Sequence, residues 1–206
     1  MRMRDSIQER VHRGELYLGK DFLFDTISIA AGAAMPNKSQ FFLVPIGTNG
    51  KTQAQTNMQN SGQLANNDIV WIRAMRISLS NNTNQIDAVN INQLTHFSIK
   101  FKNVEFTFGP LDQFPGGSQM YVTSAANLGT AIAVANLGPV TSVVNGVPSI
   151  HNVFEFGGDG YLLWKNDTLE VDQYLDTSFT LLTAANGGTG TTIRVSFDVV
   201  RAREVA

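Results

Sequence analysis

Apolar and polar residues alternate along most of this chain, and this alternation constrains the fold more than any other feature. In residues 191–200, TTIRVSFDVV, the apolar Ile193, Val195, Phe197 and Val199 share one face. Successive side chains of a β-strand point to opposite faces, so a period of two predicts a strand with one buried face. Similar runs predict about eight strands, at residues 21–30, 39–46, 68–80, 96–109, 150–156, 160–171, 177–184 and 191–200.

Two of these runs carry further predictions. In residues 68–80 the alternation places Trp71, Met75, Ile77 and Leu79 on one side. In residues 96–109 the apolar parity shifts near Lys102, which predicts one extra residue, a β-bulge, inside a long strand. Residues 85–94, QIDAVNINQL, are the one internal segment for which a helical turn or two is predicted.

Strands that follow one another without long helices exclude a doubly wound parallel sheet. They predict an all-β fold, a single eight-stranded antiparallel jelly roll, which is a two-sheet β-sandwich that hides its strand edges. We expect this single domain at residues 21–203, with long loop insertions, one of them at about 110–149. Residues 1–20 are predicted to form an N-terminal arm.

The segment FFLVPIGTNGKTQ, residues 41–53, superficially resembles a phosphate-binding loop ending in Gly50-Lys51-Thr52. Such a loop needs a glycine where this chain has Pro45, and a helix that begins at the Lys-Thr pair. The residues that follow are amides and hydroxyls without a helical period. We therefore predict a turn at Asn49-Gly50 that closes a strand.

No catalytic, cofactor or small-molecule substrate site is predicted, and the chain is not expected to be an enzyme. There is no cysteine, and the three histidines lie far apart in the sequence. A calcium site is the one metal site for which candidate ligands are named, and these are Asp167, Glu170 and Asp172. The alternative is that these carboxylates form a solvated acidic edge that discourages edge-to-edge pairing of strands.

Charged residues make up 16% of the 206 residues, and the net charge is −2, while 18 Asn and 11 Gln supply polarity instead. The ordinary charged fraction of a soluble domain is about 25%. A surface of amides can be buried against a neighbour without stranding a charge. Two interpretations remain open: a neutral, loop-rich β protein, or a surface used in subunit contacts.

The N-terminal arm holds the arginines Arg2, Arg4, Arg10 and Arg13 interspersed with acidic residues. Such an arm either packs on a neighbouring subunit, which we favour, or contacts genome or an acidic inner surface. No secretory signal is expected, because the arm has no apolar core. Residues 113–154 carry no charge, but Asn, Pro and Gly interrupt every apolar run, so no transmembrane segment is predicted.

The order of these features resembles the jelly-roll capsid proteins of tailless icosahedral bacteriophages. The resemblance rests on FLFDTISI, FFLVPIG, the polar block TNMQNSGQLANND leading into IVWIRAMRISL, then FEFGGDGYLLW and the closing IRVSFDVVRAR. It implies a structural virion protein, the major capsid protein, made in the host cytoplasm and located in the virion. Its partners would be copies of itself and other capsid proteins in an icosahedral lattice.

The resemblance also implies that the uncharged insertion is buried against a neighbouring subunit, with Phe114, Met120, Tyr121 and Ile132 as candidate interface residues. The alternative from another functional class is a carbohydrate-binding jelly roll, or a vertex or spike protein (penton, receptor-binding). In that case Trp71 and Trp164 would stack on sugar rings, although both lie in apolar runs where core packing is usual.

Overall fold

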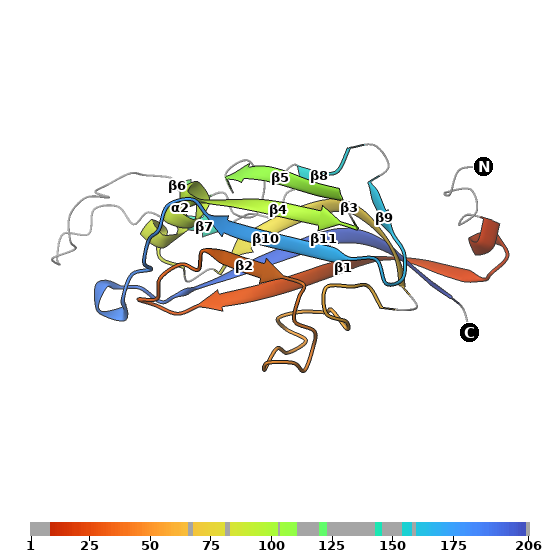
Figure 1. The fold of residues 1–206 in the computed structure, drawn as a ribbon, viewed down its shortest axis with the longest axis horizontal. Helices are drawn as coiled ribbons and strands as arrows, with labels where there is room; N and C mark the ends of the chain where they lie inside the picture. The colour runs from red at the N-terminus through yellow and green to blue at the C-terminus, as the bar shows by residue number, and fades with distance from the viewer. Residues whose placement is uncertain are drawn as a thin grey trace.

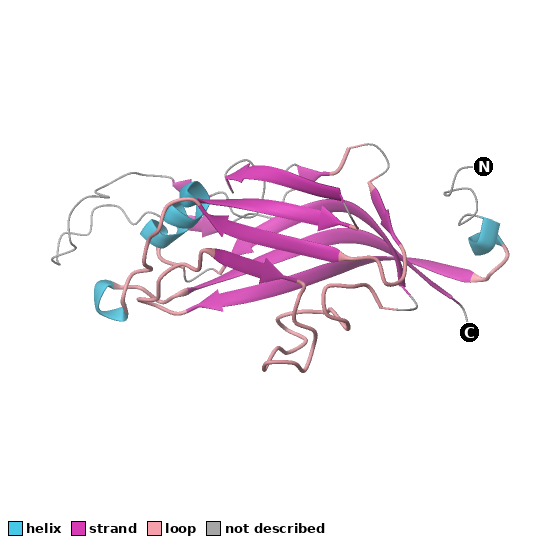
Figure 2. Ribbon diagram, in the orientation of Figure 1, coloured by secondary structure: helices cyan, strands magenta, loops and turns pink. Residues whose placement is uncertain are grey.

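The computed structural model describes residues 9–65, 68–80, 83–102, 104–110, 120–122, 143–145, 154–157 and 160–204. It is an all-β sandwich of two antiparallel sheets with few helices, as Figures 1 and 2 show. None of the helices in the described residues has the length and apolar character needed to cross a membrane.

The first sheet has five strands and is built around β11. The edge strand β1 (Leu16–Ile29) pairs with β11 (Thr191–Glu204), which pairs with β3 (Asp68–Leu79). On its other side β3 pairs with β8 (Phe154–Glu155) and with β9 (Tyr161–Leu163). Leu16 lies opposite Glu204, so the start of β1 and the end of β11 lie at the same end of the sandwich (Figure 1).

The second sheet has four strands in the order β2 (Lys38–Phe41), β10 (Leu169–Leu175), β4 (Thr95–Phe101) and β5 (Val104–Pro110). The connections carry the helix α2 (Gln85–Leu94) and the 3-10 turn η2 (Ala184–Asn186). Two short strands in the predicted insertion, β6 (Met120–Val122) and β7 (Val143–Asn145), pair with each other.

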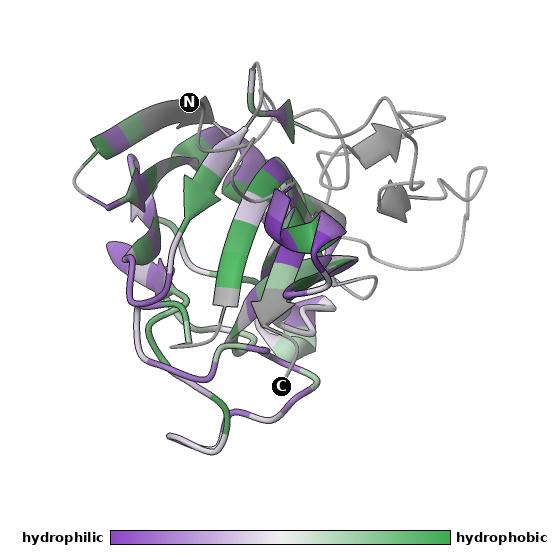
Figure 3. Ribbon diagram, turned by 90° about the vertical axis from the view of Figure 1, so that its right-hand side faces the viewer, coloured by the Kyte–Doolittle hydropathy of each residue, from purple (hydrophilic) through white to green (hydrophobic). Residues whose placement is uncertain are grey.

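The core lies between the sheets and uses the alternation that the sequence predicts. Ile193, Val195 and Phe197 are fully buried, and Val199 nearly so, which confirms the predicted inner face of β11. The ring of Phe197 packs against Phe42 at 5.4 Å between centroids and against other aromatic rings from both sheets. Figure 3, viewed along the sandwich, shows that the strands carry both apolar and polar residues.

The predicted helical segment is confirmed as α2. Asn84 caps it, its side chain accepting a hydrogen bond from the N–H of Ile86 at 2.9 Å. The helix buries Ala88 and Ile91, whereas Ile86 stays exposed. An Asn cap satisfies one of the backbone donors that a helix leaves unpaired at its start.

The prediction of a bulged strand at residues 96–109 is wrong. The chain reverses at Lys102, whose φ is +56°, and β4 and β5 pair as an antiparallel hairpin with Phe101 opposite Val104. The parity shift arises because the chain turns back, since a tight turn also changes which residues face the core. A turn and a bulge both shift the parity of the apolar residues, so the sequence pattern does not distinguish them.

A bulge does occur in β3, and it corrects the predicted face of Trp71. The pairing of β11 with β3 shifts between Asp198 and Val199, which leaves Arg73 as the extra residue of β3. Met75, Ile77 and Leu79 face the core as predicted, but beyond the bulge Val70 and Ile72 are buried instead. Trp71 opposes Val200 on the other face and is only partly buried.

Four further predicted elements differ in extent. The strand predicted at residues 39–46 is β2, which ends at Phe41. Residues 177–184 do not form a strand; Thr180 makes a single bridge to Ala34 and η2 follows. Residues 160–171 are broken by a turn at Asn166, whose φ is +63°, so that β9 and β10 belong to different sheets. Finally, β1 begins at Leu16, inside the segment predicted to be an arm.

Candidate interaction surface

The first half of β1 presents an exposed apolar strip, which we define as Tyr17, Leu18 and Phe22. Their side chains are 68%, 39% and 54% exposed, and they account for half of the large exposed apolar residues in the described part of the chain. Leu18 and Phe22 lie on one face of the strand and Tyr17 on the other, so β1 exposes apolar side chains on both faces. Exposed apolar side chains gathered in one place mark an interaction surface.

Part of the edge of β1 is already covered by the chain itself. The side chain of Asn57 accepts a hydrogen bond from the N–H of Phe24 at 2.9 Å and donates to the C=O of Phe22 at 2.5 Å. The hydroxyl of Thr26 donates to the C=O of Gln55 at 2.7 Å. Residues 55–57 therefore protect the edge between Phe22 and Thr26.

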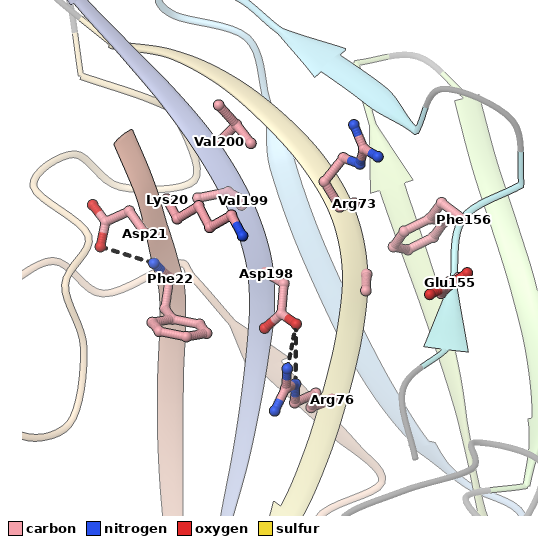
Figure 4. Close-up of a pocket in the computed structure, with 11 residues that line it drawn as sticks. Lys20, Asp21, Phe22, Arg73, Arg76, Glu155, Phe156, Asp198, Val199 and Val200 are labelled. Atoms are coloured by element: carbon pink, nitrogen blue, oxygen red, sulfur yellow. Dashed lines mark hydrogen bonds and ion pairs between the residues drawn. The ribbon is translucent and has the colours of Figure 1, made fainter. Parts of the chain in front are cut away.

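A groove of about 570 Å³ lies on the outer face of the first sheet, beside Phe22. Its walls come from β1, β11, β3 and β8, as Figure 4 shows. The bulge in β3 allows both Arg73 and Arg76 to line the groove. Residues an odd number apart would otherwise point to opposite faces of the strand.

The charges along this groove balance. The cations are Lys20, Arg73 and Arg76, and the carboxylates are Asp21, Glu155 and Asp198. Arg76 donates from Nε (3.2 Å) and from Nη2 to Asp198 Oδ2, and the guanidinium of Arg73 lies 6.0 Å from the ring centre of Trp71. Such balance does not favour a strongly charged ligand, whether anion or cation.

The outer face of the second sheet carries the calcium candidates, and each is paired with a different lysine. The Nζ–carboxylate distances are 3.0 Å from Lys102 to Asp167, 3.8 Å from Lys100 to Glu170 and 2.9 Å from Lys38 to Asp172. The hydrogen bond that Lys38 donates to the carboxylate of Asp172 raises the pKa of the lysine ammonium. Within the described residues no three His, Cys, Asp or Glu side chains gather as metal ligands.

Of the histidines, His96 lies on this face, with Nδ1 2.7 Å from Asp176 Oδ1 and its ring stacked on Tyr174 at 5.2 Å between centroids. His12 is exposed in the short helical segment before β1. His151 lies outside the described residues. The histidines that the structure describes therefore share no site.

The segment that resembles a phosphate-binding loop forms the predicted turn, but the turn does not close a strand, because β2 ends at Phe41. Asn49 and Gly50 have φ values of +51° and +76°. Lys51 reaches inward to the buried carboxylate of Asp25, with 2.5 Å between Nζ and Oδ1, and the other oxygen of Asp25 accepts from the N–H of Phe42 at 2.7 Å. This lysine therefore anchors a loop to β1.

The predicted interface and arm residues are described only in part. Met120 and Tyr121 lie in β6, opposite Asn145 and Val144 of β7, while Phe114 and Ile132 lie outside the described residues. Arg2 and Arg4 also lie outside them. Arg10 and Arg13 both contact Glu15, with Nε–carboxylate distances of 3.2 and 2.8 Å, so the carboxylate offsets part of the positive charge of the arm.

Sequence reasoning missed the apolar strip, because it assigned residues 16–20 to the arm. The signal was present in LYLGKDF, where apolar residues occupy both parities of an otherwise alternating strand. A strand whose two faces are both apolar is covered on both sides. In this structure the second sheet does not bury Tyr17, so its face is open.

No family model matches the sequence, and neither a curated protein nor a solved structure matches it significantly.

Proposed function

We propose that the chain is the major capsid protein of a tailless icosahedral bacteriophage, built on one eight-stranded jelly roll. In this proposal its function is mechanical. Each copy buries part of its surface against other copies and other capsid proteins, and the protein carries out no chemical reaction. Its place is then the virion, after synthesis in the host cytoplasm.

The strand order supports the jelly roll. This fold is a long hairpin rolled up, so that the first strand pairs with the eighth, the second with the seventh, the third with the sixth and the fourth with the fifth. Here β1 pairs with β11, β2 with β10, β3 with β8 and β9, and β4 with β5. The order is complete if β8 and β9 are one interrupted strand and β6 and β7 belong to an insertion.

The arrangement of β8 and β9 supports counting them as one strand. They pair with β3 on either side of the bulged Arg73, and the N–H of Phe156 bonds to the C=O of Arg73 at 3.1 Å. Gly160 lets the chain pass close to β3, because a Cβ there would lie 2.2 Å from the C=O of Ile72. The interruption between β8 and β9 thus lies opposite the extra residue of β3.

The observation that carries the assembly function is the apolar strip of Tyr17, Leu18 and Phe22 at the end of the sandwich. In a monomer these side chains remain in water, whereas a shell subunit buries them in lateral contacts. The small number of charged residues is consistent with such contacts, since few charges would be desolvated on assembly.

Assembly can be measured directly on the purified full chain. We expect light scattering after size exclusion to give a mass above that of the monomer, and negative-stain microscopy to show rings, capsomers or shells. Replacing all three strip residues with serine should shift the chain toward monomer. Val104→Ser is the matched control, because Val104 is also 54% exposed but lies on β5.

A monomeric wild-type chain at high concentration, with or without other virion proteins, would overturn the assembly function. If the triple serine variant assembles as the wild type does, the strip takes no part in the contacts. If neither Val104→Ser nor the triple variant differs from wild type, the lateral contacts lie on another part of the surface.

One observation favours the carbohydrate-binding or spike alternative. The groove beside the exposed ring of Phe22 holds charged hydrogen-bonding groups, including a buried oxygen of Asp198 with no hydrogen-bond partner among the described residues. An aromatic ring beside polar groups is the composition of many small-ligand sites. Specific, saturable binding on a glycan array, abolished by Asp198→Asn, would favour this alternative over the shell.

A further inference from the structure

The free part of the β1 edge carries unpaired backbone hydrogen-bonding groups. At Phe24 the N–H points away from β11, toward Asn57, and at Phe22 the C=O does the same. Along an antiparallel strand every second residue points its N–H and C=O the same way. Leu18 and Lys20 therefore point theirs outward, and no described residue bonds to them.

We propose that this edge pairs with the same edge of a second copy of the chain, antiparallel, about a two-fold axis at Gly19. The two first sheets then join into one continuous sheet across the interface. The inference deepens the proposed function and rests on it, because it specifies one contact of the shell. An exposed edge strand is a template for this kind of strand addition.

Electrostatics and hydrogen bonding select the register. Only residues whose backbone groups point outward can exchange hydrogen bonds, and the two-fold axes that centre on the free stretch 18–20 lie at Leu18, Gly19 or Lys20. An axis at Lys20 sets two lysines directly opposite each other. Like charges directly opposite are destabilising.

An axis at Leu18 is disfavoured for a related reason. It would set Asp21 of one copy opposite Glu15 of the other, which immediately precedes β1, and so bring two carboxylates together. The axis at Gly19 has no like charges opposite each other. It lets the outward N–H and C=O groups of Leu18 bond to those of the second copy's Lys20, and the reverse.

The side chains of this register are complementary. Tyr17 lies opposite the second copy's Asp21, in the kind of pair whose side chains approach closely, so the phenol O–H can donate to the carboxylate. Leu18 lies beside the aliphatic stem of the second copy's Lys20, which can cover it while the ammonium stays in water. The pairing thus covers two of the three strip residues.

Single cysteine substitutions can test the register, because the chain has no cysteine of its own that could form other disulfides. Across the proposed axis the two Gly19 Cα atoms lie about 4.5 Å apart, a distance that a disulfide spans. Gly19 does not have positive φ, and a Cβ there meets only the Tyr17 ring, at 3.3 Å. We expect mild oxidation of Gly19→Cys to convert most of the chain to a disulfide-linked dimer on a non-reducing gel.

Cysteines at Leu18 and Lys20 report the two rejected registers. Ser28→Cys is the matched control, since Ser28 is exposed on the same strand beyond the covered segment. In a Gly19→Cys background, Leu18→Pro removes one outward N–H without breaking a bond to β11, as proline does at a sheet edge. It should lower cross-linking at least tenfold while the urea unfolding midpoint of the reduced protein stays unchanged.

Cross-linking at Leu18 or Lys20 in preference to Gly19 would overturn the register. Cross-linking at Ser28 equal to that at Gly19 would overturn the pairing as a specific contact. A wild-type chain that assembles while Gly19→Cys never cross-links would also overturn the pairing, and would leave the shell function standing. A cross-linked dimer that forms nothing larger supports the pairing and counts against the shell.

Discussion

The buried ion pair between Asp25 and Lys51 provides the sharpest test of how the long loop after β2 is held. We consider Lys51→Met, which keeps the length and apolar stem of the side chain and removes its charge. Asp25 is fully buried, and Lys51 is 14% exposed. The substitution removes the contact with Lys51, and the carboxylate of Asp25 keeps its hydrogen bond from the N–H of Phe42.

The expected loss is large because the remaining charge stays out of water. Removing one partner of a buried ion pair costs about 3–5 kcal/mol. Phe42 adds to the effect, because its φ of +65° is strained for a bulky residue and the hydrogen bond from its N–H to Asp25 helps to hold it. Loosening this bond would also disturb the packing of the buried Phe42 ring on Phe197.

Urea unfolding, followed by tryptophan fluorescence, measures this loss. It is best done in the Leu18→Pro background so that assembly does not contribute to stability. With an m-value of about 2 kcal/mol per molar urea, the midpoint should fall by about 1.5–2.5 M. Asp25→Asn combined with Lys51→Met should restore part of it, because no isolated charge is then buried.

A midpoint for Lys51→Met within about 0.3 M of the parent would refute this reasoning, since it would correspond to a change near 0.5 kcal/mol. A double variant less stable than Lys51→Met would also contradict it. That result would mean that the carboxylate of Asp25 stabilises the fold without its lysine, through Phe42 alone.

Three further predictions concern stability in the same background. Burial raises the pKa of the Asp87 carboxyl above its ordinary value of 3.8, although a hydrogen bond from the N–H of Leu182 opposes this. The contribution of the protonated Asp87 to stability is therefore present below pH 3.8 and is lost as pH rises through the folded-state pKa. In urea titrations between pH 4 and pH 8, Asp87→Asn should therefore gain stability relative to wild type. A constant difference across that range would contradict the assignment. Gly160→Ala should cost about 2 kcal/mol or more in the same assay, because its φ is +75° and the added Cβ would lie 2.2 Å from the C=O of Ile72; an unchanged midpoint would mean that β8 and β9 can separate from β3 freely. Asn84→Ala should cost about 1 kcal/mol through loss of the α2 cap, whereas Asn84→Ser should cost far less.

Much of the secondary structure could be predicted from the sequence, because a strand with one buried face leaves a period of two in its residues. β11 is the clearest case, since Ile193, Val195, Phe197 and Val199 are buried as the pattern predicts. The turn at Asn49-Gly50 could be predicted because a positive φ is a local requirement, and these residue types meet it.

The candidate surface could be predicted only in part. The residues of the strip are visible in LYLGKDF, but exposure depends on how far the second sheet extends over the first. The three calcium candidates lie on or beside one strand, and their spacing could not show that Lys38, Lys100 and Lys102 come from β2, β4 and the turn after it. Such pairs join residues far apart in the chain.

What the sequence alone determined is therefore local: which segments are strands, which face of β11 is buried, where α2 forms and where the chain turns at Gly50. What only the tertiary structure decided is long-range. The bulge that turns Trp71 outward, the hairpin at Lys102, the pairing of Lys51 with Asp25 and the open edge at Leu18 all depend on a neighbouring strand. Side-chain alternation is a property of one strand, whereas register, bulges and edges are properties of a pair.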